Sequence, residues 1–180
     1  MHLGPADPSS GCGNVLPRAS IPKYFSRHIT DNILSVEPDA RFHFGTNPCR
    51  VRFFSQELVF FREELIGRLR RNCVIAPSDD HTLPTHLCRT ITQQSHLCPL
   101  PLHVQPVMWP YDNSLSLYPL PHVVIAAEQY DQYEKFNQGC QVINPGAFSL
   151  DFSFVVYYPA TKTCEFSKIN PEDDREPEDE

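Results

Sequence analysis

The sequence has no apolar run of 18 residues, and its first residues, MHLGPADPSS, contain neither the basic nor the apolar region of a signal peptide. The first absence argues against a transmembrane helix, and the second argues against secretion. We therefore expect a soluble, intracellular protein that has no membrane partner.

An excess of positive charge is also absent. The formal net charge is −7, of which the last ten residues, PEDDREPEDE, contribute −6, so that residues 1–170 carry only −1. A nearly neutral body gives no electrostatic indication of autonomous nucleic-acid binding. We expect the tail, residues 170–180, to be disordered, because acidic runs of this kind are usually solvated. Docking of the tail to a basic partner is the alternative.

Short motifs of common enzymes are missing as well. The sequence contains no Gly-x-Ser-x-Gly, no phosphate-binding loop and no Gly-x-Gly-x-x-Gly, which are the signatures of serine hydrolases and nucleotide-binding proteins. The basic run of Arg68, Arg70 and Arg71 could contact phosphates. We favour a solvated helix end for these three arginines.

What the sequence does contain is enough apolar material for one domain. Of the 180 residues, 41% are hydrophobic and 11% aromatic, and the 18 prolines argue against a helical protein. The seven cysteines are odd in number and scattered. Without a secretion signal, we interpret them as reduced thiols that fill core positions.

Hydrophobic periodicity predicts a mixed arrangement of helices and strands. A strand is expected to begin at Phe42 and Phe44, and residues 100–121 are expected to form an irregular covering loop. The other predicted elements are a helix at 21–34, a hairpin of strands 50–55 and 58–61 joined by Gln56 and Glu57, helices at 63–71 and 86–94 with Thr85 as cap of the second, and strands at 123–127, 140–143, 152–158 and 163–169.

Two groups of residues are candidates for metal sites. The first is His86, Cys88, His96, Cys98 and His103, which lie within 18 residues. Their His-x-Cys spacing does not match structural zinc sites, and residues two apart in a helix point away from each other, so we favour packing.

The second group follows the apolar run VVIAA, where Glu128, Asp131 and Glu134 surround a polar loop. Carboxylates could hold a hard cation such as Mg²⁺. A two-metal centre, however, needs several ligands that converge from separate strand ends, and the sequence offers few.

Seven segments occur in an order that resembles a known family. With their gaps they resemble the C-terminal part of the B subunits of the eukaryotic replicative DNA polymerases, and within that family the DNA polymerase epsilon branch. The likeness covers about residues 2–169 and is specific only as a set. The segments are GPADP (4–8), TNPCRVRFF (46–54), VFFREEL (59–65), RRNCV (70–74), SHLCPLPLHVQPVMWPYD (95–112), YPLPHVVIAAEQYD (118–131) and INPGAFSLDFSFVVYYP (143–159).

The resemblance implies an α/β (α+β) fold, namely the C-terminal part of an αββα sandwich similar to the calcineurin-like metallophosphoesterases. Active members of that family hold two metal ions at strand ends. In the register set by the INPG turn, Glu128 and Tyr130 stand where those enzymes carry both histidines of Gly-His-x-His. The isolated histidine ligand would fall near Arg62, and none is present there.

A third ligand motif is lost in the same register. Pro5 and Ala6 replace the Asn and His of Gly-Asn-His-Asp, and only Asp7 remains. Phenol ionises near pH 10, so a tyrosine is a poor ligand at neutral pH. We therefore expect an inactivated phosphoesterase-like domain at 1–169 with no catalytic residue, no metal site and no cofactor.

By the same resemblance, the chain is expected to be a non-catalytic accessory and scaffold subunit in nuclear DNA replication. Its expected partners are the C-terminal zinc region of the catalytic subunit of DNA polymerase epsilon and other holoenzyme and replisome subunits, with DNA bound through the complex. The segment around Trp109 and Tyr111 is a candidate contact, with intramolecular cover as the alternative. A metal-dependent phosphodiesterase or exonuclease, a DNA-binding module and a B subunit of another replicative polymerase are the alternative functions.

The resemblance also implies a fragment. Met1 falls at the Gly-Asn-His-Asp position, so the earlier strands and the oligonucleotide-binding domain of such subunits would be missing. Half of a sandwich leaves strand edges and apolar faces uncovered. We therefore expect the isolated chain to have low stability.

Overall fold

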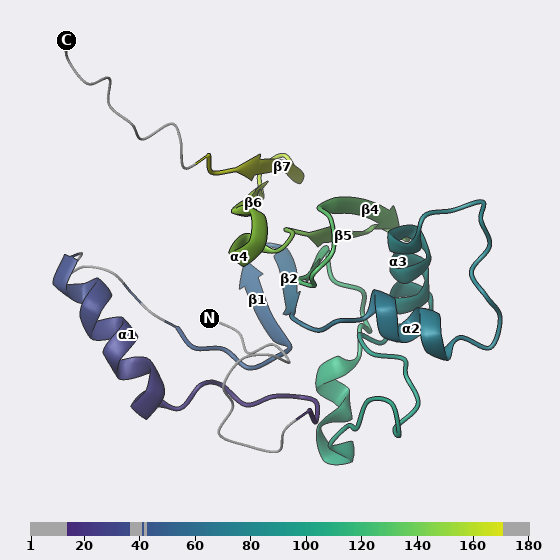
Figure 1. Cartoon of the computed structure of the whole chain (residues 1–180), viewed down its shortest axis with the longest axis horizontal. Coiled ribbons are helices and arrows are strands. Elements are labelled where there is room, and N and C mark those ends of the chain that lie inside the picture. The colour runs from purple at the N-terminus through teal and green to yellow at the C-terminus, as the bar shows by residue number, and fades with distance from the viewer. Residues whose placement is uncertain (1–13, 37–40, 42, 171–180) are drawn as a thin grey trace, which may run out of the picture.

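A five-stranded mixed sheet forms the centre of the molecule. The computed structural model describes residues 14–36, 41 and 43–170. The strands are β1 (Cys49–Phe53), β2 (Gln56–Phe61), β3 (Val123–Ala126), β4 (Tyr133–Asn137) and β5 (Cys140–Asn144), in the order β1-β2-β3-β5-β4 (Figure 1). β2, β3 and β5 run parallel, whereas the edge strands β1 and β4 are antiparallel to their neighbours.

The connection from β2 to β3 covers one face of the sheet. It contains α2 (Ile66–Asn72), α3 (Leu83–Gln93) and the 3₁₀ helix η1 (Trp109–Leu115). Alternate strand residues such as Val59, Val124 and Val142 point to this face, because residues paired across a ladder share a side. With helix residues such as Leu87 and Ile91 they form the larger of two buried clusters.

The opposite face is covered by a separate two-stranded hairpin, β6 (Ser153–Tyr158) and β7 (Thr163–Lys168), which follows the short helix α4 (Phe148–Asp151). Leu58, Val123 and Ile143 form the buried part of a second cluster, and side chains of the hairpin pack on it. The Tyr157 hydroxyl also donates a hydrogen bond of 2.8 Å to Gln56 Oε1. The sheet therefore has a hydrophobic cluster on each side, as expected for a sheet that includes parallel strands.

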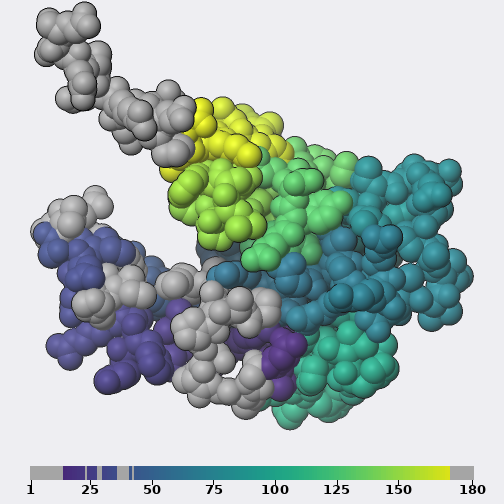
Figure 2. Space-filling model, viewed as in Figure 1, coloured from purple at the N-terminus to yellow at the C-terminus, as the bar shows by residue number. Residues whose placement is uncertain are grey.

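The remaining helix, α1 (Lys23–Val36), lies at one end of the molecule, away from the sheet, and Figure 2 shows it on the opposite side from α3. Tyr24 is 87% exposed and Phe25 55% exposed. Their rings contact each other edge to face, with centroids 5.4 Å apart. α1 confirms the helix predicted at 21–34, with a shift of two residues at each end.

Two predictions about the first hairpin were wrong. Phe44 is not in a strand, and Phe42 lies outside the described residues. The turn between β1 and β2 is formed by Phe54 and Ser55 rather than by Gln56 and Glu57. Phe54 adopts a left-handed conformation (φ 52°). Gln56 instead begins β2, because its buried side chain bonds to the β6–β7 hairpin.

The predicted helix boundaries also needed correction. α2 begins at Ile66 rather than at residue 63, because Glu63 and Glu64 leave the helix to bond elsewhere. The buried helix face and the basic last turn were predicted correctly. α3 begins three residues earlier than expected, with Thr82 rather than Thr85 as its N-cap residue.

Three elements were not predicted: β4, α4 and η1. The strands expected at 123–127, 140–143, 152–158 and 163–169 are confirmed as β3, β5, β6 and β7 within one residue at each end. The mixed α/β fold class is therefore confirmed. No helix of the described residues is long and apolar enough to cross a membrane. Residues 171–180, almost the whole predicted tail, lie outside the described residues, as do residues 1–13.

Candidate functional site

The carboxyl ends of the three parallel strands meet at one edge of the sheet, where α/β proteins commonly bind ligands. β2 ends at Phe61, β3 at Ala126 and β5 at Asn144. The segments that follow β2 and β3 contain polar and charged residues, including Glu63 and Glu128. This edge is the candidate functional site, because the predicted loop after β3 lies there.

Glu128 is buried at this edge and is fully engaged by the protein. Its Oε2 accepts hydrogen bonds of 3.0 Å from the backbone N–H groups of both Leu65 and Ile66, at the beginning of α2. Its Oε1 accepts a bond of 3.2 Å from the Tyr133 hydroxyl on β4. Only 4% of Glu128 is exposed. The carboxyl group therefore joins α2 to β4 and is not presented to solvent.

Burial dominates the electrostatics of Glu128. Desolvation raises the pKa of its carboxyl group to about 7, although the bonds from Ile66, Leu65 and Tyr133 each favour the charged form. The same burial, together with the neighbouring Glu128, raises the pKa of the Tyr133 phenol above its ordinary value. Both side chains therefore keep their protons to a higher pH than exposed side chains of the same type would.

Asn144, the last residue of β5, holds the loop after β3 in place. Asn144 Oδ1 accepts a bond of 3.2 Å from the Glu128 N–H, and its Nδ2 donates to the carbonyl oxygens of Tyr130 (2.9 Å) and Asp131 (3.2 Å). Asn144 is fully buried. One side chain thus holds the backbone of the whole candidate loop.

A second buried carboxylate, Glu63, lies after β2. Its Oε2 is 2.8 Å from Arg18 Nη2, and its Oε1 is 2.9 Å from Arg68 Nη2. The Glu63 side chain has no exposed surface. Neither contact has the geometry of a hydrogen bond, so both are ion pairs. The Glu63 carboxylate thus lies between two guanidinium groups.

Arg18 connects the N-terminal segment of the described chain to this site. Its backbone N–H and carbonyl both bond to the backbone of Asn47, and Asn47 Oδ1 and Nδ2 in turn bond to the backbone of Arg62. Gln105 donates to the carbonyl of Asn14 and accepts a bond from Arg68. Among the described residues, Arg18 Nη1 is buried with no hydrogen-bond partner. Four separate chain segments are therefore joined by polar side chains at this edge.

The structure separates the three acids of the predicted loop. Glu128 is buried beneath α2, whereas Asp131 is exposed. Glu134 pairs with Ile143 across the β4–β5 ladder and so lies on the opposite face of the sheet from Tyr133. Tyr130 packs against the larger core, with its ring centroid 6.2 Å from that of Tyr133. In the described ranges, no three His, Cys, Asp or Glu residues form a group that could hold a metal ion.

The histidines and cysteines of the other candidate group have separate environments. Cys88 and Cys98 are core residues, and burial raises the pKa of their thiols to about 11 and about 12. His96 Nε2 lies 3.3 Å from Asp112 Oδ1, and His86 bonds to the carbonyl of Ser78. His103 is exposed.

Sequence reasoning missed the residues that organise the edge. Asn47, Gln105 and Asn144 are each fully buried polar residues. Asn47 and Asn144 each precede a proline, and Asn-Pro is a turn signal. That signal marked the INPG turn at Asn144, but no local pattern indicates that the amide groups of Asn47 and Asn144 bond to distant backbone.

Of the two alternative roles expected of the segment 100–121, the structure shows intramolecular cover. Leu115 and Leu117 are fully buried in the larger core, so the segment covers the sheet. Its aromatic side chains point outward: Trp109 is 74% exposed, Tyr111 59% and Tyr118 85%. Aromatic side chains are enriched at the buried centres of protein–protein contacts.

The sequence is similar to a well-defined set of proteins. A family model for the B subunit of DNA polymerases alpha and epsilon matches residues 4–135. The chain is 45% identical to the DNA polymerase epsilon B subunit of Arabidopsis thaliana, and 42% identical to the DNA polymerase epsilon subunit 2 of Mus musculus and to that of Homo sapiens. Each alignment of 168 residues covers 92% of this chain and 30% of the relative. The chain thus spans less than a third of the length of these relatives.

Proposed function

The chain belongs to the B-subunit family of DNA polymerases alpha and epsilon, and from this premise we propose that it is a non-catalytic scaffold subunit of a DNA polymerase epsilon holoenzyme in the nucleus. The observation that carries the proposal is the identity of 42% to 45% over 92% of the chain to relatives named as subunits of that polymerase. DNA would be reached through the complex, because residues 1–170 have a net charge of only −1.

The absence of catalysis is proposed from the chemistry of the candidate site. Glu128 already accepts three hydrogen bonds from the protein, and Glu63 is held between two arginines. Both carboxylates would have to abandon these partners before they could bind a cation. This supports the interpretation of residues 1–169 as a phosphoesterase-like domain whose metal ligands have been replaced by structural contacts.

The docking surface proposed for the catalytic subunit is the aromatic surface, defined as Trp109, Tyr111 and Tyr118. These side chains are exposed, and they stand on a segment anchored in the core by Leu115 and Leu117. A rigid base lowers the entropy lost on binding, and buried aromatic side chains contribute disproportionately to affinity. The proposed ligand is the C-terminal zinc region of the polymerase epsilon catalytic subunit.

Co-expression of the full chain with this zinc region, followed by size-exclusion chromatography, tests the proposal. We expect stoichiometric co-elution, and we expect the double substitution W109A/Y111A to weaken the complex at least tenfold. Tyr24→Ala is the control, because Tyr24 is an even more exposed aromatic residue but lies on α1.

A folded chain that fails to co-elute would contradict the scaffold proposal. Equal losses from the double variant and from the control would contradict the aromatic surface while leaving the scaffold proposal standing. Circular dichroism of each variant shows whether it is folded.

A further inference from the structure

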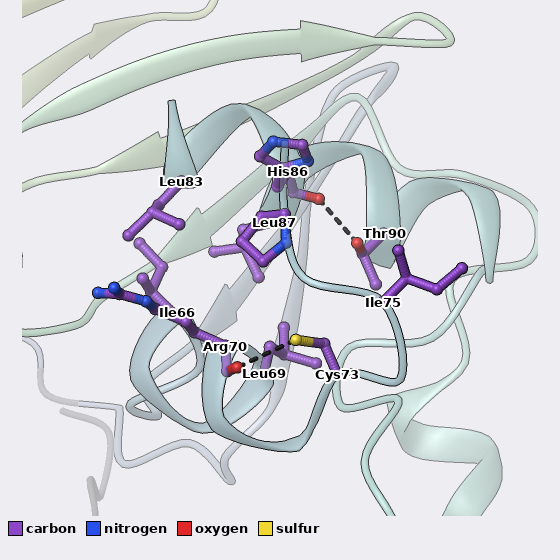
Figure 3. A pocket seen from close by; sticks show the side chains of 10 residues that line it. Ile66, Leu69, Arg70, Cys73, Ile75, Leu83, His86, Leu87 and Thr90 are labelled. Atoms are coloured by element: carbon purple, nitrogen blue, oxygen red, sulfur yellow. Dashed lines mark hydrogen bonds between the residues drawn. The ribbon is translucent and has the colours of Figure 1, made fainter. Parts of the chain in front are cut away.

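A pocket lies between α2 and α3. It adjoins the strand edge at Ile66, whose N–H bonds to Glu128, and none of the three residues of the aromatic surface lines it. Figure 3 shows it closed on the third side by the loop that contains Ile75. Its volume is about 140 Å³. A cavity of comparable size in another protein accommodates a benzene molecule, so the pocket has room for one aliphatic or aromatic side chain.

The pocket is chemically suited to an apolar group. Its inner wall is formed by Ile66, Leu69 and Leu87, which belong to or pack against the larger core. Two polar side chains of the wall are engaged internally: Cys73 Sγ bonds to the Arg70 carbonyl (3.0 Å), and Thr90 Oγ1 bonds to the His86 carbonyl (2.8 Å). A polar occupant would gain few hydrogen bonds there.

Apolar surface continues outside the pocket. Val74 is completely exposed and Ile75 is 84% exposed, and both follow Cys73, the C-cap residue of α2. Single exposed apolar residues are ordinary on a protein surface. Two adjacent branched residues beside an apolar pocket form a contiguous patch, which is typical of an interaction site.

The charge of the rim indicates the kind of partner. Arg70 lines the pocket on the side opposite Ile75 (Figure 3) and is exposed, as is Arg71. Within the described part of the chain, neither arginine takes part in an ion pair, whereas Arg68 is paired with Glu63. No acidic residue lines the pocket. A complementary ligand therefore places a carboxylate near Arg70 and an apolar side chain towards Leu69 and Ile75.

We propose that the α2–α3 pocket binds a short acidic segment of a second protein, with one apolar side chain inserted between the helices and a carboxylate paired with Arg70. The site is separate from the aromatic surface and does not depend on the proposed docking of the catalytic subunit. The chain's own acidic tail is a less suitable occupant. The last ten residues contain no aliphatic or aromatic anchor, and β7, which precedes them, packs on the opposite face of the sheet from α3.

Selection of peptides from a randomised dodecapeptide display library, with the full 180-residue chain as bait, tests the proposal. We expect the enriched peptides to be net acidic and to share one Leu, Ile or aromatic anchor. Binding of a fluorescein-labelled enriched peptide, followed by fluorescence anisotropy, should weaken at least tenfold for Arg70→Glu. The matched control Arg89→Glu reverses the charge of an exposed arginine on α3 that does not line the pocket, and should change affinity less than twofold.

A second pair of variants tests the apolar contact between the peptide and the pocket, and neither substitution lies in a helix. Ile75→Asp should abolish binding, whereas Phe54→Asp, at an equally exposed position (85%) in the β1–β2 turn, should not. Thermal unfolding identifies any variant that fails to fold. Enrichment of neutral or basic peptides, no enrichment, or equal effects of each variant and its control would overturn the proposal. A large gain in peptide affinity on removal of residues 171–180 would also overturn it, because the tail would then be the occupant.

Discussion

At the scale of single residues, Glu128 makes the stability of the chain depend on pH. Burial raises the pKa of its carboxyl group from the ordinary 4.5 to about 7, so the folded state favours the protonated form. The contribution of Glu128 to the free energy of unfolding should be complete below pH 4.5 and should be lost as the pH rises to about 7. A shift of this size corresponds to roughly 3 kcal/mol at most. Urea unfolding between about pH 5 and 8 measures the slope.

Glu128→Gln isolates this contribution. The amide oxygen can still accept the bonds from Leu65 and Ile66, but the side chain no longer ionises. The variant should therefore lose most of the pH slope and should be at least as stable as the wild type at pH 8. Glu64→Gln is the control, since Glu64 is not deeply buried and accepts only the Gln129 N–H. An unchanged slope in Glu128→Gln would show that other groups cause it.

At the scale of secondary-structure elements, two glycines should respond in opposite directions to the same substitution. Gly146, in the turn after β5, has φ +84°, and a Cβ there would clash with Ser153 Oγ and lie 3.0 Å from Gln132 Cγ. Gly146→Ala should destabilise the chain by about 2 to 3 kcal/mol. Gly67, in α2, has open space around its Cα, and Gly67→Ala should stabilise by about 0.5 kcal/mol. Denaturant midpoints compare the two, and similar midpoints would contradict the assignment of the turn.

The elements also show how far a sequence predicts a fold. Apolar β-branched runs such as that of β3 predicted the buried strands, because such residues pack in sheets with both faces covered. β4 was missed because YEKFN carries charges on an edge strand. Its turn to β5 has positive φ at Gln138 and Gly139, a conformation that favours glycine, so the Gln-Gly pair was the available signal. The start of α2 was misplaced because Glu63 has its partners in distant segments.

At the scale of the whole molecule, the apolar run before Glu128 predicted that this residue follows a buried strand, and the structure places it there. Its partners at Leu65 and Tyr133 come from two different elements and could not be predicted from spacing. The acids Asp131 and Glu134 looked equivalent in the sequence, but alternation along β4 puts Glu134 on the other face. Long-range contacts of this kind leave no periodic trace in the chain.

The same arrangement predicts the response of the whole chain to metal. Because the buried carboxylates are committed to N–H donors and guanidinium groups, millimolar Mn²⁺ should move the midpoint of thermal unfolding by less than about 1 °C. We expect no hydrolysis of bis-p-nitrophenyl phosphate under these conditions. Turnover that depends on Mn²⁺ and is lost in Glu128→Gln would contradict the proposal of an inactivated site.

The bonds of the segment around Leu16 have a consequence for synthesis of the chain on the ribosome. Leu16 exchanges backbone hydrogen bonds with Pro106 and Met108, and Arg18 is paired with Glu63. These partners are translated long after the segment itself, at about 5 to 20 residues per second. Asn47, which bonds to the backbone of Arg18, is translated first, whereas Leu16 waits roughly 5 s or more for Pro106 and Met108. The backbone of Leu16 therefore stays accessible to chaperones and proteases until the connection between β2 and β3 has emerged.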